Sequence, residues 1–475
     1  MTNGATVKQH VINATKTTLR RFVGPAIARR RPRRVDLAHS RWGLEVGPKG
    51  HLARHGVDLV TLTETHGSPL VVVDGDALDR AASEATCAGT DGPSADIFYS
   101  YKTNPIPAVL AALHRCGIGA EVISPYELWL ALRLGVPGNR IIYNGPAKSF
   151  DSLRVAVRCG VLAINANSSG DLALIRRAAQ VEGMRANVGV RVAMPTMWRG
   201  QFGFNSESTD LLDAIRQSSD DPDLDLRAMH LHRGLSMRSA DDFESYVREV
   251  LALCDTLRNA TGFHPSILDL GGSLMCPTVA HLGTQEYRLN RALATDLLPP
   301  DPSTAVSVGG ASRLATTIVT KHATAAGLPT PRIVLEPGRA LTSSSQMLLS
   351  TVHDVKRDGA IPHVVLDAGV NVAEPTSSEY HQLFSVTSPT AAHETSYRVV
   401  GPICTPADVL YNHWRLPELE HGHVLAIMDT GAYFVPFSTS FSFPRPAIVI
   451  QRGKSIEVAR DRETFEHMAA LDHFP

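Results

Sequence analysis

A lysine between a strand and a helix is the most reactive candidate in this chain. Lys102 follows the apolar run 97–100 and precedes Pro105 and Pro107, which are typical of a helix start. Burial at such a place lowers the pKa of a lysine toward the neutral amine. A neutral amine can condense with an aldehyde to give a Schiff base, which is how pyridoxal phosphate is held. A solvent-exposed lysine without chemistry is the alternative, and it is favoured when Lys102 is taken alone.

Polar residues also follow two later apolar runs. Glu336 and Arg339 come after the run 332–335, and Gly271 and Gly272 come after another. A carboxylate beside a pyridine nitrogen keeps that nitrogen protonated, which makes the ring an electron sink, and an arginine can bind phosphate. Glycines at a strand end let backbone N–H groups approach a phosphate. Each pattern is weak by itself, because many turns look alike.

Two histidines and one acid lie within predicted strands. Strand alternation puts His230 and His232 on one face, where one ring could stack on a pyridine and the other is better interpreted as a hydrogen-bonded core histidine. Glu121 lies in an apolar strand and must be paired there. Ser124 and Glu127 have the spacing of a capping box at the next helix start.

A thiol and an acid lie close together near the end of the chain. Cys404 and Asp408 share the segment 401–408, and Tyr433 follows a glycine turn. For each residue taken singly, an inert buried cysteine and a core tyrosine are the commoner roles.

Alternating strands and helices must position these residues. The predicted strands are 97–101, 119–123, 140–143, 162–165, 187–193, 225–231, 267–270 and 332–335. The predicted helices include 126–134, 150–159, 169–181, 209–218 and 241–261. Eight such steps, over a length typical of that fold, predict a closed (β/α)₈ barrel of the TIM type, in which strand ends meet at one mouth. An open doubly wound sheet is the alternative, but no GxGxxG follows the first strand to favour it.

The pattern divides the chain into four parts. We expect a basic extension over 1–41, a segment 42–68 that joins a β domain, a barrel over 69–345 and a C-terminal β domain over 346–475. Residues 275–330 interrupt the alternation of strands and helices. This segment is rich in proline and serine and has a predicted helix near 311–326, which indicates a surface insertion.

The composition does not favour nucleic acid or membrane as a partner. The formal net charge is −1, so charge does not favour nucleic acid, and we see no apolar stretch long enough to span a membrane. Six scattered cysteines without a CxxC pair favour reduced thiols in a cytoplasm over disulfides or a metal site. The first 35 residues are arginine-rich and acid-free. That composition resembles a transit peptide, but we favour a solvated basic extension.

Taken together, the motifs resemble the pyridoxal-phosphate-dependent decarboxylases of fold type III, which act on diaminopimelate, ornithine and arginine or lysine. The similarity covers about residues 55–455. Its ordered motifs are Tyr-Lys-Thr-Asn at 101–104, Ser-x-x-Glu at 124–127, Asn-Gly-Pro-Ala-Lys-Ser at 144–149, Gln-Phe-Gly at 201–203, His-x-Gly at 232–234, Asp-Leu-Gly-Gly at 269–272, Glu-Pro-Gly-Arg at 336–339, Gly-Pro-Ile-Cys at 401–404 and Gly-Ala-Tyr at 431–433. The resemblance implies an alanine-racemase-like barrel with a C-terminal β-barrel or β-sandwich domain.

The resemblance also implies roles for individual residues. Lys102 would bind pyridoxal 5'-phosphate covalently, His232 would stack on its ring and Glu336 would pair with its pyridine nitrogen. Cys404 would return a proton to Cα after CO₂ leaves, from the other subunit of a homodimer with active sites at the interface. The phosphate contacts would be Gly271, Gly272, Ser273, Arg339 and Tyr433.

Several positions depart from the family pattern. Leu235 replaces the serine of His-x-Gly-Ser, Ser273 replaces a third glycine, and the usual Phe-Asn-Gly is Phe-Ser-Phe at 441–443. Cys404 is followed by Thr405-Pro406, with Asp408 later, and Glu374-Pro375 stands where diaminopimelate decarboxylases carry Arg-Pro. We therefore expect Glu374, Thr405 and Asp408 to contact the substrate.

A charge reversal in a buried site should discriminate strongly between substrates. The expected substrate is accordingly a basic or diamino acid other than meso-diaminopimelate.

Three functions remain open from the sequence. The leading hypothesis is an amino acid decarboxylase, with diaminopimelate decarboxylase proper as an alternative. A racemase on the same barrel would need two opposed bases at Cα, usually a lysine and a tyrosine, whereas Cys404 favours decarboxylation. A non-catalytic binding protein is the third, and the presence of Lys102, Glu336 and Cys404 argues against it.

Overall fold

The computed structural model describes residues 37–86, 94–197, 200–234, 237–359 and 361–474. It consists of two compact units. One unit contains residues 77–277 and 303–342, and the other contains residues up to 76, 278–302 and 343–475. The predicted basic extension lies outside the described residues up to position 36, as do Leu235 and Ser236.

The first unit contains a closed barrel of eight parallel strands. Its strands are β5 (Asp96–Ser100), β6 (Gly119–Val122), β7 (Ile141–Tyr143), β8 (Ala163–Ala166), β9 (Ala186–Ala193), β11 (Leu224–Leu231), β12 (Ile267–Asp269) and β14 (Arg332–Leu335). They pair in this order, and β14 pairs with β5 to close the ring. The short strand β10 (Phe204–Asn205) adds to β9. The predicted barrel is therefore confirmed, and the open sheet is excluded.

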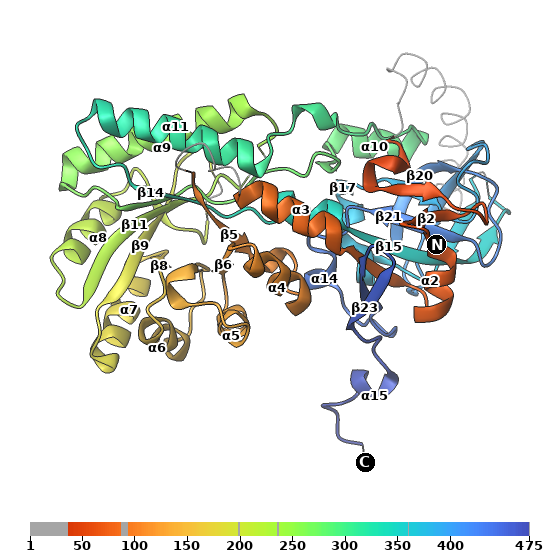
Figure 1. Cartoon of the computed structure of the whole chain (residues 1–475), viewed down its shortest axis with the longest axis horizontal. Helices are drawn as coiled ribbons and strands as arrows, with labels where there is room; N and C mark the ends of the chain where they lie inside the picture. The colour runs from red at the N-terminus through yellow and green to blue at the C-terminus, as the bar shows by residue number, and fades with distance from the viewer. Residues whose placement is uncertain (1–36, 87–93, 198–199, 235–236, 360, 475) are drawn as a thin grey trace, which may run out of the picture. The chain divides into compact units, whose positions relative to one another are not determined.

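Helices surround this barrel, as the sequence pattern predicts (Figure 1). They are α4 (Pro107–Arg115), α5 (Pro125–Arg133), α6 (Phe150–Arg158), α7 (Ser169–Glu182), α8 (Thr209–Ser219), α9 (Ala240–Thr261), α11 (Val308–Ala325) and the short α12 (Arg339–Thr342). Helix α3 (Gly75–Thr86) precedes β5. Prolines at the first turns of α4 and α5 fix helical backbone angles where no N–H donor is needed.

Helices cover the outer face of every barrel strand, so the strands are buried on both faces and carry apolar side chains. The inward-facing side chains fill the barrel. One buried cluster draws on six of the eight strands or their edges: Phe98, Ile142, Leu162, Ala163, Ala228, Ile267 and Val334. This packing holds the strand ends in a fixed ring, so the polar residues that follow the strands are positioned by a rigid frame.

The second unit is rich in antiparallel strands. Its main sheet has the order β20-β19-β16-β15-β4-β22-β23, and β21 joins β15 to β18. The strands are β4 (Leu70–Asp74), β15 (Gln346–Lys356), β16 (His363–Leu366), β18 (Leu383–Ser385), β19 (Thr395–Val400), β20 (Val409–Leu416), β21 (Val424–Met428), β22 (Ala447–Arg452) and β23 (Ser455–Arg460).

Smaller elements complete the β-rich unit. They are β1 (Leu44–Val46), β2 (Leu52–Arg54), β3 (Val57–Asp58), α2 (Leu59–His66), β13 (Ala280–His281), α10 (Thr284–Leu293), α13 (Val370–Ala373), β17 (Glu379–Tyr380), α14 (Phe434–Phe437) and α15 (Phe465–Met468). Strands β1 to β3 form a separate three-stranded sheet.

Two boundaries differ from the expected ones. Strand β4 lies after the predicted start of the barrel at residue 69, yet it pairs with β15 and β22 in the β-rich unit. Of the predicted insertion, only residues 278–302 belong to the β-rich unit. Helix α11 instead packs beside α9 on the barrel (Figure 1). Strand pairing across hundreds of residues decides these boundaries, and local composition does not report it.

Within the described residues, no helix combines the length and the apolar character that crossing a bilayer requires.

Candidate active site

Lys102 lies in a single 3₁₀ turn, η3 (Tyr101–Thr103), directly after β5. Its amine is 3.7 Å from a carboxylate oxygen of Glu121, and its side chain keeps 36% of its exposure. The Lys102 side chain is therefore only partly buried. The strand ends at the mouth of the barrel, where a long side chain reaches solvent and a neighbouring strand supplies the opposite charge.

Glu121 is fully buried at the end of β6 and has three polar neighbours. The register of β5 and β6 sets Ser100 beside Glu121, and the Ser100 hydroxyl donates a 2.5 Å hydrogen bond to Oε2. The side-chain amide of Asn144 donates to Oε1 at 3.0 Å. The sequence indicated that this acid must be paired, and the structure confirms it.

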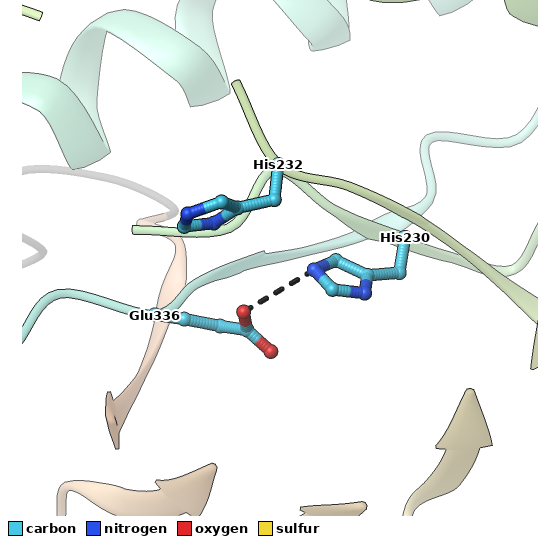
Figure 2. A group of neighbouring side chains, drawn as sticks. All are labelled: His230, His232 and Glu336. Atoms are coloured by element: carbon cyan, nitrogen blue, oxygen red, sulfur yellow. Dashed lines mark ion pairs between the residues drawn. The ribbon is translucent and has the colours of Figure 1, made fainter. Parts of the chain in front are cut away.

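Glu336 follows β14 and forms the centre of a second group (Figure 2). Its carboxylate points toward the His230 ring, with Oε2 3.3 Å from Nε2. Burial opposes the ionisation of Glu336, but the charge of His230 and the hydrogen bonds with His230 and Asp269 outweigh it, so the pKa lies well below the ordinary value. Burial and the charge of Glu336 hold the pKa of Asp269 well above its ordinary value. Of the two carboxyl groups of Glu336 and Asp269, that of Glu336 is therefore the ionised one.

His232 lies beside Glu336 and His230 (Figure 2), and a glycine-rich turn contacts its ring. The backbone N–H of Gly272 donates to Nδ1 at 3.3 Å, and Nε2 is 3.3 Å from the Ser273 hydroxyl. Burial and the charge of Lys102 lower the pKa of His232 well below its ordinary value, so the ring is neutral. Ser273, which replaces a family glycine, therefore orients His232 through its side chain.

Close backbone packing joins the segment 336–339 to the turn that carries Lys102. A Cβ at Gly338 would lie 2.0 Å from the Thr103 hydroxyl, so only glycine fits there. The backbone N–H of Ser100 donates to the Pro337 carbonyl at 3.3 Å. Arg339 is half-buried at the start of α12, within the same unit.

A second lysine, in the loop between β7 and α6, is buried. The Lys148 side chain is fully buried, and its amine donates to the carbonyls of Gly145 and Asn165 at 2.7 and 2.8 Å. Burial lowers its pKa to about 8, against the opposing charge of Asp171. The two carbonyl groups already hold the Lys148 amine, so this side chain connects two loops. Of the two lysines, Lys102 has the accessible amine.

These residues fit a pyridoxal cofactor. An accessible amine, an ionised carboxylate and a neutral imidazole are the groups that would meet its aldehyde, its pyridine nitrogen and its ring face. The ligand atoms of His230, His232 and Glu336 also lie within 4.8 Å of one another, a spacing that a metal ion could use. The adjacent lysine is not needed for such a metal site, whereas the cofactor requires it.

The β-rich unit carries the other predicted site residues. Cys404 is exposed, in a loop that Asp408 holds. The two Asp408 oxygens accept hydrogen bonds from the backbone N–H groups of Val370, at 2.8 Å, and Ile403, at 2.7 Å. Asp408 is buried and supports this loop through both hydrogen bonds, and its contact with the substrate stays a prediction.

Tyr433 and the acid at 374 also lie in this unit. Tyr433 adopts a left-handed backbone conformation before α14, and its ring stacks on Phe437 at 5.8 Å. Glu374 is exposed after α13, and one of its oxygens is 3.4 Å from the Ser377 hydroxyl. Thr405 is half-buried, and its hydroxyl accepts from the Ala407 N–H.

The sequence missed three features of this site. Asn144 directly follows β7 and Asn165 lies near the end of β8, so the rule that barrel strand ends converge could have identified both. The Ser124 hydroxyl caps α5 as predicted, but Glu127 accepts from the Ile123 N–H at 2.8 Å, so the capping box is incomplete. The partner of His230 is Glu336, which only the closed ring brings near.

This barrel and its mouth define a class of enzyme, and comparison with known proteins agrees. Residues 81–343, more than half of the chain, match the family model described as the pyridoxal binding domain of pyridoxal-dependent decarboxylases. The chain belongs to this family. It is a carboxy-lyase whose cofactor is pyridoxal phosphate.

Several relatives are similar over nearly their whole length. Diaminopimelate decarboxylase of Methanocaldococcus jannaschii is 27% identical over 88% of this chain and 94% of the relative. The enzyme of that name from Methanothermobacter thermautotrophicus is 28% identical over 91% and 98%. A crystal structure of the M. jannaschii enzyme has a TM-score of 0.78 at 25% identity, over 91% of this chain and 98% of that one.

A more distant neighbour shares the fold alone. It is the lysine/ornithine decarboxylase of Vibrio vulnificus, solved with putrescine, with a TM-score of 0.65 at 18% identity over 83% of this chain and 97% of that one.

These relatives overturn the expectation of a substrate other than meso-diaminopimelate. That expectation assumed that Glu374 lies in a buried site, where a reversed charge would be decisive. Glu374 is exposed in this structure, so solvent weakens any repulsion between its carboxylate and a substrate.

Proposed function

We propose that this enzyme decarboxylates meso-diaminopimelate. The observation that carries the proposal is the mouth of the barrel, where Lys102, Glu121, His232 and Glu336 come together in a chain that resembles diaminopimelate decarboxylases over 88% of its length. An acid at position 374 is compatible with this substrate, because the distal end of diaminopimelate carries an ammonium group beside its carboxylate.

Each residue has a task in this proposal. The Lys102 amine is the covalent attachment point, and Glu121 holds it as an ion pair when it is free. The ionised Glu336 carboxylate would keep the pyridine nitrogen protonated, and the neutral His232 ring would bind the face of the cofactor. The cofactor, when bound, accepts the electron pair that remains at Cα when CO₂ departs. Gly271, Gly272, Ser273, Arg339 and Tyr433 are the proposed phosphate contacts.

Cys404 completes the reaction in this proposal. Its thiol gives a proton to Cα, so that a C–H bond replaces the broken bond to the carboxylate carbon, and water restores the thiol proton. Support comes from the exposure of Cys404 and from the two hydrogen bonds through which Asp408 holds its loop. Glu374 and Thr405 are proposed to contact the distal end of the substrate.

We further propose a homodimer that works in the cytoplasm, in which the partner subunit supplies the thiol. The cysteines that the structure describes form no disulfide with one another, which supports a reducing compartment; they are Cys116, Cys159, Cys254, Cys276 and Cys404.

The test is a substrate panel with detection of CO₂. We expect the enzyme loaded with pyridoxal phosphate to release CO₂ from meso-diaminopimelate faster than from lysine, ornithine or arginine, and the Lys102→Ala variant to lose at least about 1,000-fold of this rate, as for covalent catalysts. Faster turnover of another amino acid would refute the proposed substrate. Loss of optical activity without CO₂ release would indicate a racemase.

A further inference from the structure

Asn144 connects the two acidic residues of the barrel mouth. It follows β7 and is 2% exposed. Its Nδ2 donates to Oε1 of Glu121 at 3.0 Å and to Oε1 of Glu336 at 2.7 Å. One amide group therefore contacts both carboxylates.

The orientation of this amide is fixed by its partners. Ionised carboxylates only accept hydrogen bonds, so the NH₂ end of Asn144 must face them. Its Oδ1 accepts from Nδ2 of Asn165 at 2.8 Å, and the Asn165 carbonyl accepts from Lys148. The amide thus forms part of a continuous hydrogen-bonded chain across the ends of β6, β7, β8 and β14, and such chains hold their members in one arrangement.

Both carboxylates have a second partner in the site. Glu121 is 3.7 Å from the Lys102 amine, and Glu336 is 3.3 Å from His230. We propose that Asn144 is a positioning residue. It sets the distance between Glu121, which holds the Lys102 amine, and Glu336, which would face the pyridine nitrogen. This inference rests on the proposed function of the site as a pyridoxal phosphate site.

An isosteric change tests the proposal. Asn144→Asp keeps the shape but puts a third carboxyl group where both glutamates need a donor, so one of the three must take up a proton or move away. We expect the affinity for pyridoxal phosphate to fall about tenfold, because neighbouring like charges oppose ionisation and Glu336 would be less fully ionised. We also expect kcat for CO₂ release to fall about tenfold while KM stays within about twofold, since Asn144 is proposed to act through Glu121 and Glu336 and not on the substrate.

Asn187→Asp is the matched control. Asn187 is half-buried at the start of β9, at the opposite end of the barrel, and its amide donates to the Val161 carbonyl at 2.8 Å. The same chemical change there removes one half-buried donor without touching the mouth. We expect it to lower the melting temperature while leaving cofactor affinity and kcat unchanged.

Absorbance titration of each variant with pyridoxal phosphate measures the affinity for the cofactor. Steady-state kinetics, expressed per mole of bound cofactor, then measure kcat and KM. If Asn144→Asp does not fold, Asn144→Ala replaces it, with the same direction expected because both carboxylates lose their shared donor. A folded position-144 variant with wild-type affinity and kcat would overturn the inference. If the wild-type protein itself takes up no pyridoxal phosphate, the proposed function fails instead.

Discussion

At the scale of single residues, the turn at 271–273 shows why its glycines are needed. Gly271 has a φ of +66°, and a Cβ there would lie 2.6 Å from Nδ1 of His232 and 2.8 Å from the Leu231 carbonyl. A side chain at this position would therefore strain the backbone and push the imidazole out of place.

We expect Gly271→Ala to cost more stability than a left-handed alanine alone, which costs about 1–2 kcal/mol, and to weaken cofactor binding. Gly262→Ala is the control, because Gly262 has a φ of +77° and a Cβ added there would meet no atom within 4 Å. Thermal unfolding and absorbance titration would measure both effects. Equal losses of stability in the two variants, with unchanged cofactor affinity, would show that the contact with His232 does not matter.

At the scale of elements, the start of α5 carries a buried acid. Burial and the charge of Glu121 raise the pKa of Glu127 to about 7, although the Ile123 N–H and the charge of Lys102 oppose this. Because this pKa exceeds the ordinary value of 4.5, the folded protein binds more protons than the unfolded chain between about pH 4.5 and 7. Glu127 therefore contributes stability that is lost as the pH rises through this range.

We expect Glu127→Gln to remove this loss, since a glutamine does not titrate and its carbonyl can still accept from Ile123. Relative to wild type, the variant should gain up to about 3 kcal/mol in the free energy of unfolding between pH 4.5 and 7. Urea denaturation at several pH values would measure it. Glu84→Gln, at an exposed position in α3, is the control. A difference between Glu127→Gln and wild type that does not change with pH would contradict the expectation.

The elements themselves could largely be predicted from the sequence. All eight barrel strands were expected close to their observed bounds, since each is a short apolar run between amphipathic helices. The contacts at their ends could not be predicted to the same degree. The pairing of Glu336 with His230, and the contact of Asn144 with two carboxylates, depend on which strands become neighbours when the ring closes.

At the scale of the whole molecule, the proposed site residues divide between two units. Lys102, His232 and Glu336 belong to the barrel, whereas Cys404 and Tyr433 belong to the β-rich unit. The sequence predicted this division but misplaced its first boundary, because β4 is apolar like a barrel strand and its partners, β15 and β22, lie far along the chain. The substrate was misjudged for a similar reason, since a sequence does not report whether Glu374 is exposed.

The most direct measurement asks which lysine binds the cofactor. The protein would be incubated with pyridoxal phosphate, reduced with borohydride, digested and mapped by mass spectrometry. We expect the phosphopyridoxyl group on Lys102, whose amine is accessible, and none on Lys148, which is fully buried and hydrogen-bonded. A modified Lys148 with an unmodified Lys102, or no modified lysine at all, would contradict the central claim that Lys102 is the attachment point.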